Sequence, residues 1–200
     1  MPAPRAPGRT RAHLLEAALD VVGERGHAGT TMQRVADAAG VDKALLHYYF
    51  GNKAGLLAAV VEHLGERLLA DAERAVAGLD DPASIVEIGF SAMWDHAIAE
   101  PRLHAVWLSL YAAAITDAEL SAEVALVRAR YRALVAARME ALLRAGWRSR
   151  LSPAATVTLV LAAIDGYVVA LLEGGRTPEL DEAIAATQAL VAGLITREVP

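Results

Sequence analysis

The chain of 200 residues is 55% hydrophobic but only 5% aromatic, and it carries a formal net charge of −5. It contains no cysteine, which excludes disulfides and thiolate-bound metals and is compatible with the reducing cytoplasm, where we expect the protein to be located. Alanine and leucine dominate the composition, and both are strong helix formers, so the composition predicts an all-α protein.

Residues 1–10 have a proline-rich start and no hydrophobic periodicity, so we predict a disordered arm. They lack the apolar stretch of a signal peptide, and we therefore expect no export signal. From residue 11 to residue 25, apolar side chains recur on one helical face, and Gly26 is placed to end this helix. The stripe consists of Leu14, Leu15, Ala18, Leu19 and Val22.

Two short helices follow. Thr30 and Thr31 offer an N-cap for a helix that reaches about residue 38, and Gly40 breaks it. Asp42 is a candidate N-cap for a third helix that ends near Phe50.

The rest of the chain keeps a helical pattern without sustained alternation of period two. Helices are predicted over residues 53–78, 83–98, 101–115, 118–145, 153–173 and 178–197. The predicted fold is therefore all-α with about nine helices: an N-terminal three-helix helix-turn-helix domain followed by a C-terminal helical bundle.

The segment from Ala154 to Leu172 is apolar enough to suggest a membrane span. It contains Asp165, whose charge is costly in a bilayer, and no second span accompanies it. A buried bundle helix or a subunit interface needs the same composition, so we expect no membrane partner.

The charge is unevenly distributed along the chain. Residues 1–53 hold seven basic and five acidic residues, whereas the remainder holds twelve basic and nineteen acidic residues. A mildly basic head on an acidic body favours approach of the head to a polyanion.

The spacing of small and apolar residues around Gly40 suits a helix-turn-helix. Such a motif needs a small residue where its helices cross, a residue that accepts a left-handed turn, and apolar side chains that hold the crossing angle. Ala36, Gly40, Val41 and Leu46 supply these features. The second helix of such a pair enters the major groove of DNA with its N-terminal residues on base edges.

The sequence here also resembles a known family. The run GVDKALLHYYFGNK at residues 40–53, followed by Leu56-Leu57, closely resembles the DNA-binding domain of the TetR family of bacterial transcriptional regulators. The resemblance implies a DNA-binding domain over residues 11–55 and a ligand-binding and dimerisation domain over residues 56–200. Trp94, Pro101 and Asp165-Gly166 further resemble the choline-responsive BetI-type branch.

The resemblance implies roles for individual residues. Hydroxyls and backbone amides at the start of the second helix bind phosphate, Lys43 reaches guanine or a phosphate, and His47 faces the groove. The implied DNA-binding residues are Thr30, Thr31, Lys43, Ala44, His47, Tyr48, Tyr49 and Lys53.

Two positions depart from the family pattern, and several residues have alternative readings. Asp42 stands where Ser or Thr is frequent and repels phosphate, and Leu45 is apolar where small or polar residues are frequent. Tyr48 and Tyr49 could instead be core aromatics, and the two lysines could be ordinary solvated side chains.

The last two predicted helices are strongly apolar and suit a four-helix seam between two subunits. The alternative is an intramolecular core. In the family these helices form a homodimer, which implies a palindromic operator in double-stranded DNA.

The middle helices carry the candidate ligand site that the resemblance implies, with aromatic walls and polar anchors. Its candidate residues are Trp94, His96, His104, Trp107, Tyr111, Arg128 and Tyr131. His96 and His104 could also form a metal pair, but no third ligand has a suggestive spacing, so we predict no metal and no cofactor.

The sequence contains no G-x-S-x-G motif, phosphate-binding glycine loop or H-E-x-x-H motif, so we expect no enzyme. The prediction is a ligand-responsive transcriptional regulator, by family default a repressor, that a small-molecule effector releases from its operator. The alternative is a DNA-binding or protein-interaction dimer without an effector.

Overall fold

A computed structural model describes residues 7–197, which form nine α-helices and two short β-strands. The chain divides into two compact units. The first comprises the chain up to Arg67 together with Arg102–Val127, and the second comprises Leu68–Pro101 together with the chain from Arg128 onward. The all-α prediction and the predicted number of helices are confirmed for the described residues.

The first unit begins with α1 (Pro7–Gly29), whose regular path is interrupted at Gly26, where φ is 66° and ψ is 176°. A positive φ strains residues that have a Cβ, so Gly26 ends the regular helix as predicted. The predicted arm is wrong for residues 7–10, which form the start of α1 because Pro7 is tolerated in the first turn of a helix. Residues 1–6 of that arm lie outside the described residues.

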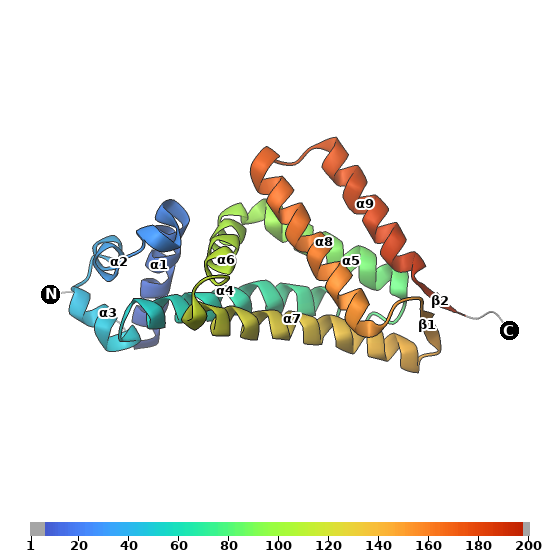
Figure 1. The fold of residues 1–200 in the computed structure, drawn as a ribbon, viewed down its shortest axis with the longest axis horizontal. Helices are drawn as coiled ribbons and strands as arrows, with labels where there is room; N and C mark the ends of the chain where they lie inside the picture. The colour runs from blue at the N-terminus through green and yellow to red at the C-terminus, as the bar shows by residue number, and fades with distance from the viewer. Residues whose placement is uncertain (1–6, 198–200) are drawn as a thin grey trace. The chain divides into compact units, whose positions relative to one another are not determined.

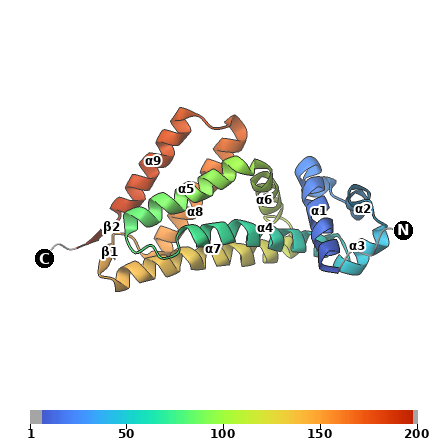
Figure 2. The same ribbon diagram turned by 180° about the vertical axis from the view of Figure 1, so that it is seen from behind.

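Helices α2 (Met32–Ala39) and α3 (Lys43–Phe50) follow, and α4 (Lys53–Ala75) leaves the group. Figures 1 and 2 show α1, α2 and α3 gathered beside the beginning of α4. The core beneath them contains the predicted stripe of α1, with Leu14, Leu15 and Val22 at most 1% exposed.

Helix α6 (Pro101–Ala113) and the beginning of α7 (Ala118–Arg144) also belong to the first unit. Arg102 Nη2 lies 2.6 Å from Asp20 Oδ1 of α1, and Val106 and Leu110 of α6 are buried. The predicted domain boundary between residues 55 and 56 therefore does not coincide with the compact units. Val106 of α6 lies close to Gly23 of α1, and Val127 of α7 lies close to Gly65 of α4, although these segments are distant in sequence.

The second unit contains the remainder of α4 and α7 together with α5 (Pro82–Ala99), α8 (Pro153–Gly174) and α9 (Pro178–Gly193). Each of these last three helices begins with proline in its first turn and is capped by the side chain before it, as Asp81 Oδ1 accepts from Ser84 N at 2.9 Å. Val86, Phe90 and Val191 form a buried cluster between α5 and α9. Figure 1 shows α8 and α9 running antiparallel.

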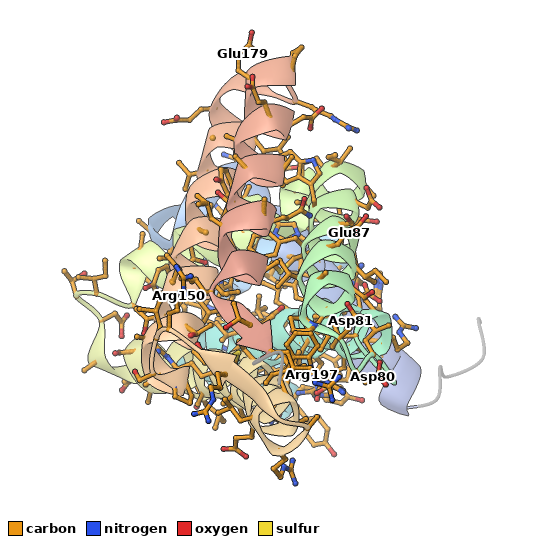
Figure 3. The ribbon with its side chains drawn as sticks, turned by 90° about the vertical axis from the view of Figure 1, so that its right-hand side faces the viewer. Asp80, Asp81, Glu87, Arg150, Glu179 and Arg197 are labelled. Atoms are coloured by element: carbon orange, nitrogen blue, oxygen red, sulfur yellow. The ribbon has the colours of Figure 1, made fainter. Side chains whose placement is uncertain are left out.

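Two three-residue strands were not predicted. Strand β1 (Trp147–Ser149) pairs antiparallel with β2 (Ile195–Arg197), and Trp147 lies opposite Arg197. The last helix therefore ends at Gly193 rather than near residue 197. Strands of three residues are too short to show an alternation of polar and apolar residues in the sequence. Ile195 of β2 is buried against Met139 and Leu142 of α7. Figure 3 shows Arg197 at the opposite end of α9 from Glu179.

Candidate DNA-binding face and effector cavity

The turn between α2 and α3 has the geometry that a helix-turn-helix requires. Gly40 adopts a left-handed conformation, with φ at 64° and ψ at 37°, and Val41 N donates to Ala36 O at 3.0 Å. Val35 and Leu46 are fully buried where the two helices cross. These contacts hold α3 at a fixed angle to α2 and leave its other face toward solvent.

The solvent face of α3 contains most of the predicted base-reading residues. Lys43, Ala44, His47 and Tyr48 are all exposed, and the exposure of Tyr48 reaches 81%. A side chain that exposed is not a core aromatic, so the alternative reading of Tyr48 is wrong. Its ring meets the half-buried Tyr49 edge-on, with 5.3 Å between ring centroids, which braces both rings on the helix.

The start of α3 carries the predicted cap. Asp42 Oδ1 accepts from Ala44 N at 2.7 Å, so this carboxylate satisfies a free amide at the helix start. His47 Nδ1 lies 2.6 Å from Gly51 O, which fixes the imidazole over the last turn of α3. The Asp42 carboxylate and the His47 ring are both directed by local hydrogen bonds.

The two threonines before α2 have different roles. Thr31 is exposed and is the N-cap of α2, where its hydroxyl accepts from Arg34 N at 3.2 Å. Thr30 is 0% exposed and its Oγ1 donates to Gly26 O at 2.8 Å. The predicted phosphate contact of the Thr30 hydroxyl is therefore not supported, because this group closes the break in α1 instead.

Lys53 opens α4 and is half-buried. Its Nζ donates to His27 O at 3.0 Å, which ties the start of α4 to the end of α1. An ammonium group has three donors, so this bond leaves Lys53 able to contact a phosphate as well.

The second unit contains an apolar cavity of about 110 Å³. Its walls come from α4, α5, α7, α8, α9 and β2, and only Tyr131, Arg138 and Thr156 contribute polar side chains to the lining. Thr156 Oγ1 is engaged with Ser152 O at 3.2 Å. A mostly apolar hollow with few polar groups is typical of a small-molecule site.

Tyr131 is the one predicted ligand residue in this lining. Burial raises the pKa of its hydroxyl, and the carboxylates of Asp71 and Asp165 raise it further. The phenol therefore stays neutral. Both carboxylates are themselves paired, since Asp165 Oδ2 lies 2.8 Å from Arg128 Nη1 and Asp71 Oδ2 lies 3.3 Å from His96 Nε2.

The other predicted ligand residues divide between the units. Trp94 borders a second hollow of about 20 Å³ in the second unit. His104, Trp107 and Tyr111 lie on α6 in the first unit, where the rings of Trp107 and Tyr111 stack at 6.3 Å. The lining of the apolar cavity belongs wholly to the second unit, so these three residues do not line it.

Comparison with known proteins decides the family. Residues 14–60 match the family described as "Bacterial regulatory proteins, tetR family", and residues 90–196 match "BetI-type transcriptional repressor, C-terminal". The chain belongs to the TetR family. It is therefore a DNA-binding transcriptional regulator, and the resemblance seen in the sequence is confirmed.

Individual relatives agree with this assignment. The HTH-type transcriptional regulator BetI of Rhizobium meliloti (strain 1021) is 31% identical over 159 residues, covering 80% of this chain and 76% of the relative. A solved transcriptional regulator from Pseudomonas aeruginosa PAO1 has a TM-score of 0.83 at 20% identity, with 94% of this chain and 91% of the other covered. A regulator from Saccharomonospora viridis, solved in complex with choline, has a TM-score of 0.78 at 17% identity and covers 96% of this chain and 100% of its own. At these identities the solved structures show the TetR fold.

Sequence reasoning missed most of the cavity of this TetR-family chain. Arg138 was not among the predicted ligand residues, although it lies seven positions after Tyr131 and so on the same face of α7. Extending the helical period from Tyr131 through Leu134 and Val135 would have found it. Phe90 and Met93 could also have been found, because they lie opposite the polar stripe of α5, which consists of Ser84, Glu87, Ser91 and Asp95.

Helix α8 is the one helix among residues 7–197 that is long and apolar enough to span a membrane by composition. Val157, Leu161 and Val168 are buried in the second unit, and Asp165 forms its ion pair there. This face of α8 therefore packs in the core of the second unit, as a buried bundle helix does.

Proposed function

We propose that this regulator binds a palindromic operator as a homodimer, represses transcription, and leaves the operator when a small molecule fills the cavity of the second unit. The observation that carries the proposal is the solvent face of α3, where Lys43, His47 and Tyr48 stand exposed over a buried Leu46. Side chains presented in this way on the second helix of a helix-turn-helix are suited to the major groove.

The face combines groups for phosphates and for bases. Lys43 supplies a cation near the start of α3, and the Tyr48 hydroxyl supplies a donor for phosphate oxygen. Ala44 leaves room for close approach to a thymine methyl group. Because Asp42 is engaged in capping, its negative charge is partly compensated by the helix amides.

The homodimer is supported by the outer faces of α8 and α9. One row of exposed residues on α8 is small or apolar and recurs every three or four positions: Ala155, Leu159, Ala162, Gly166 and Val169. On α9, Leu190 is 72% exposed. A second copy of the chain covers these surfaces in a four-helix seam, and a two-fold dimer presents two copies of α3 to successive major grooves.

The effector site is supported by the cavity and by a neighbour of the same fold that was solved with choline. Helix α4 carries Lys53 at its start and Ala72 in the cavity lining, and Glu16 of α1 lies 3.2 Å from both His63 and Arg67 of α4. An effector that favours one position of α4 shifts the population toward a form in which the two α3 helices no longer match the operator spacing.

The test is an anisotropy titration with the DNA upstream of the gene, narrowed by footprinting to its palindrome. The double variant Lys43→Ala, Tyr48→Phe is expected to weaken operator binding at least a hundredfold. Arg130→Ala, which changes an exposed arginine on α7, serves as the matched control and is expected to bind as wild type.

The operator proposal is contradicted if the double variant binds the operator as tightly as wild type does, or if wild type binds unrelated DNA equally well. A ligand that binds in the cavity but leaves operator affinity unchanged contradicts effector control, since equal affinity for both states shifts nothing.

A further inference from the structure

The apolar cavity of the second unit is lined by an arginine that has an unsatisfied N–H donor. Arg138 lines the cavity from α7, and its Nε is buried with no hydrogen-bond partner in the described part of the chain. A buried charged donor without an acceptor is unfavourable, and natural proteins rarely retain one without a reason. A ligand with an acceptor group at this position removes the penalty.

A second unsatisfied donor borders the neighbouring hollow. Trp94 Nε1 is also buried and has no hydrogen-bond partner among the described residues. The smaller hollow beside it shares Phe90, Met93 and Ile164 with the main cavity. Both unsatisfied groups are therefore N–H donors, and both border space enclosed by apolar side chains. Acceptors on the ligand match this arrangement, whereas further donors do not.

The acids of the second unit do not offset this preference. Among residues 7–197, no Asp or Glu side chain lines the cavity, and the nearby carboxylates of Asp71 and Asp165 are paired with His96 and Arg128. The Tyr131 phenol is neutral, since burial raises its pKa. A quaternary ammonium ligand such as choline would meet the Arg138 guanidinium and no free negative charge.

We propose that this cavity binds a small monocarboxylate with an apolar body, with its carboxylate on Arg138 and its body among Phe90, Met93 and Ile164. Because it assigns a chemical class to the effector, this inference rests on the proposed function. The cavity of about 110 Å³ is comparable to the roughly 150 Å³ cavity that accepts benzene in another protein, so one ring or a short chain fits. Arg138 and Tyr131 stand two helical turns apart, about 10 Å along α7, which gives such a ligand room to lie between them.

The experiment is calorimetric titration of the full chain with 3-phenylpropanoate and octanoate. The neutral 3-phenylpropan-1-ol and choline serve as comparison ligands. Arg138→Met is expected to weaken binding of both carboxylates at least tenfold, because charge-assisted hydrogen bonds are lost, and to change binding of the alcohol less than threefold. Arg132→Met, on an exposed arginine of the same helix, is the matched control and is expected to bind as wild type.

A thermal melt separates binding from folding. Arg138→Met removes an unsatisfied buried donor, so its melting temperature is expected to equal or exceed that of wild type. The inference is overturned if neither carboxylate binds, if Arg138→Met binds them as well as wild type does, or if choline binds more tightly than both.

Operator release is measured separately with the same ligands. If the carboxylates bind through Arg138 but do not release the operator, the ligand class stands and effector control fails. If the protein binds the operator but neither carboxylate, the ligand class is overturned and the regulator proposal remains.

Discussion

Gly65 of α4 lies directly against Val127 of α7: a Cβ atom built on Gly65 stands 2.7 Å from both Cγ atoms of Val127. Carbon atoms in favourable contact are about 3.5–4.0 Å apart, so the two helices meet here with no room for a methyl group. Gly65 lies within a regular helix and has no positive φ. The glycine is therefore needed for the close approach of the two helices and not for a special backbone conformation.

Replacing Gly65 by alanine is expected to destabilise the protein by about 1 kcal/mol. The overpacking of about 1–3 kcal/mol exceeds the gain of about 1 kcal/mol that alanine brings to a helix. In a Val127→Ala background the clash is removed, and the same change is expected to stabilise by about 1 kcal/mol. Urea unfolding at one protein concentration measures the free energy of unfolding of wild type, both single variants and the double variant. If Gly65→Ala changes this free energy with the same sign in both backgrounds, the contact with Val127 does not determine its effect.

Tyr48→Phe is expected to weaken operator binding about tenfold without changing the melting temperature, because the hydroxyl is solvent-exposed in the free protein. The lost group is a neutral donor, so the dependence of affinity on salt stays the same. Lys43→Ala, in contrast, is expected to lower the salt slope by about 0.9 for one phosphate contact. Anisotropy titrations over a range of salt concentrations distinguish the two, and an unchanged affinity of Tyr48→Phe contradicts the phosphate contact.

The two threonines before α2 give predictions of different size for the same change to valine. Thr30→Val keeps the volume of a fully buried side chain but leaves Gly26 O without its donor, which is expected to cost about 1–3 kcal/mol of folding free energy. Thr31→Val removes an exposed N-cap and is expected to cost about 1 kcal/mol. Denaturant unfolding measures both. A smaller loss for Thr30→Val than for Thr31→Val runs against these roles.

Tyr131 is expected to remain protonated in the folded protein at a pH where tyrosines of the unfolded chain titrate. Burial, with Asp71 and Asp165 nearby, raises its pKa above that of the unfolded chain, so its stabilising contribution is full below about pH 10 and declines as the pH rises further. Absorbance at 295 nm of wild type and Tyr131→Phe is expected to be equal up to pH 11. The unfolding free energy of wild type falls more steeply above pH 10, by at most about 1.4 kcal/mol per pH unit. Equal slopes in the two proteins contradict the assignment.

The parts of the fold that were predictable are those set by local residue chemistry. Gly26, Gly40 and the Asp42 cap act within one turn of the chain, and the structure places all three as the sequence suggested. The burial of Thr30 was not readable, because it depends on the break at Gly26 rather than on the threonine itself.

The cavity depends on contacts between distant segments. Arg138 and Phe90 meet the same hollow only after α5, α7, α8 and α9 have packed, and no local pattern states which helices come together. The grouping of α6 with the first unit has the same origin, since the contacts of Arg102 with Asp20 span most of the first half of the chain. The spacing from Tyr131 to Arg138 was a readable clue, and so was the polar stripe of α5 opposite Phe90.

Leu190 on α9 is expected to be central to the dimer. It is 72% exposed in the single chain, and Leu190→Glu places a charge where the proposed seam requires apolar contact. Ile115→Glu is the matched control, because Ile115 is 78% exposed in the first unit and lies outside α8 and α9. Sedimentation is expected to show Leu190→Glu as a monomer at concentrations where wild type and Ile115→Glu are dimers. Since one head alone loses the effective concentration that links two half-sites, operator affinity of the monomeric variant is expected to fall at least about a hundredfold. If both variants remain dimeric, the seam lies on another surface, because a buried unpaired carboxylate is not tolerated at the centre of an apolar interface.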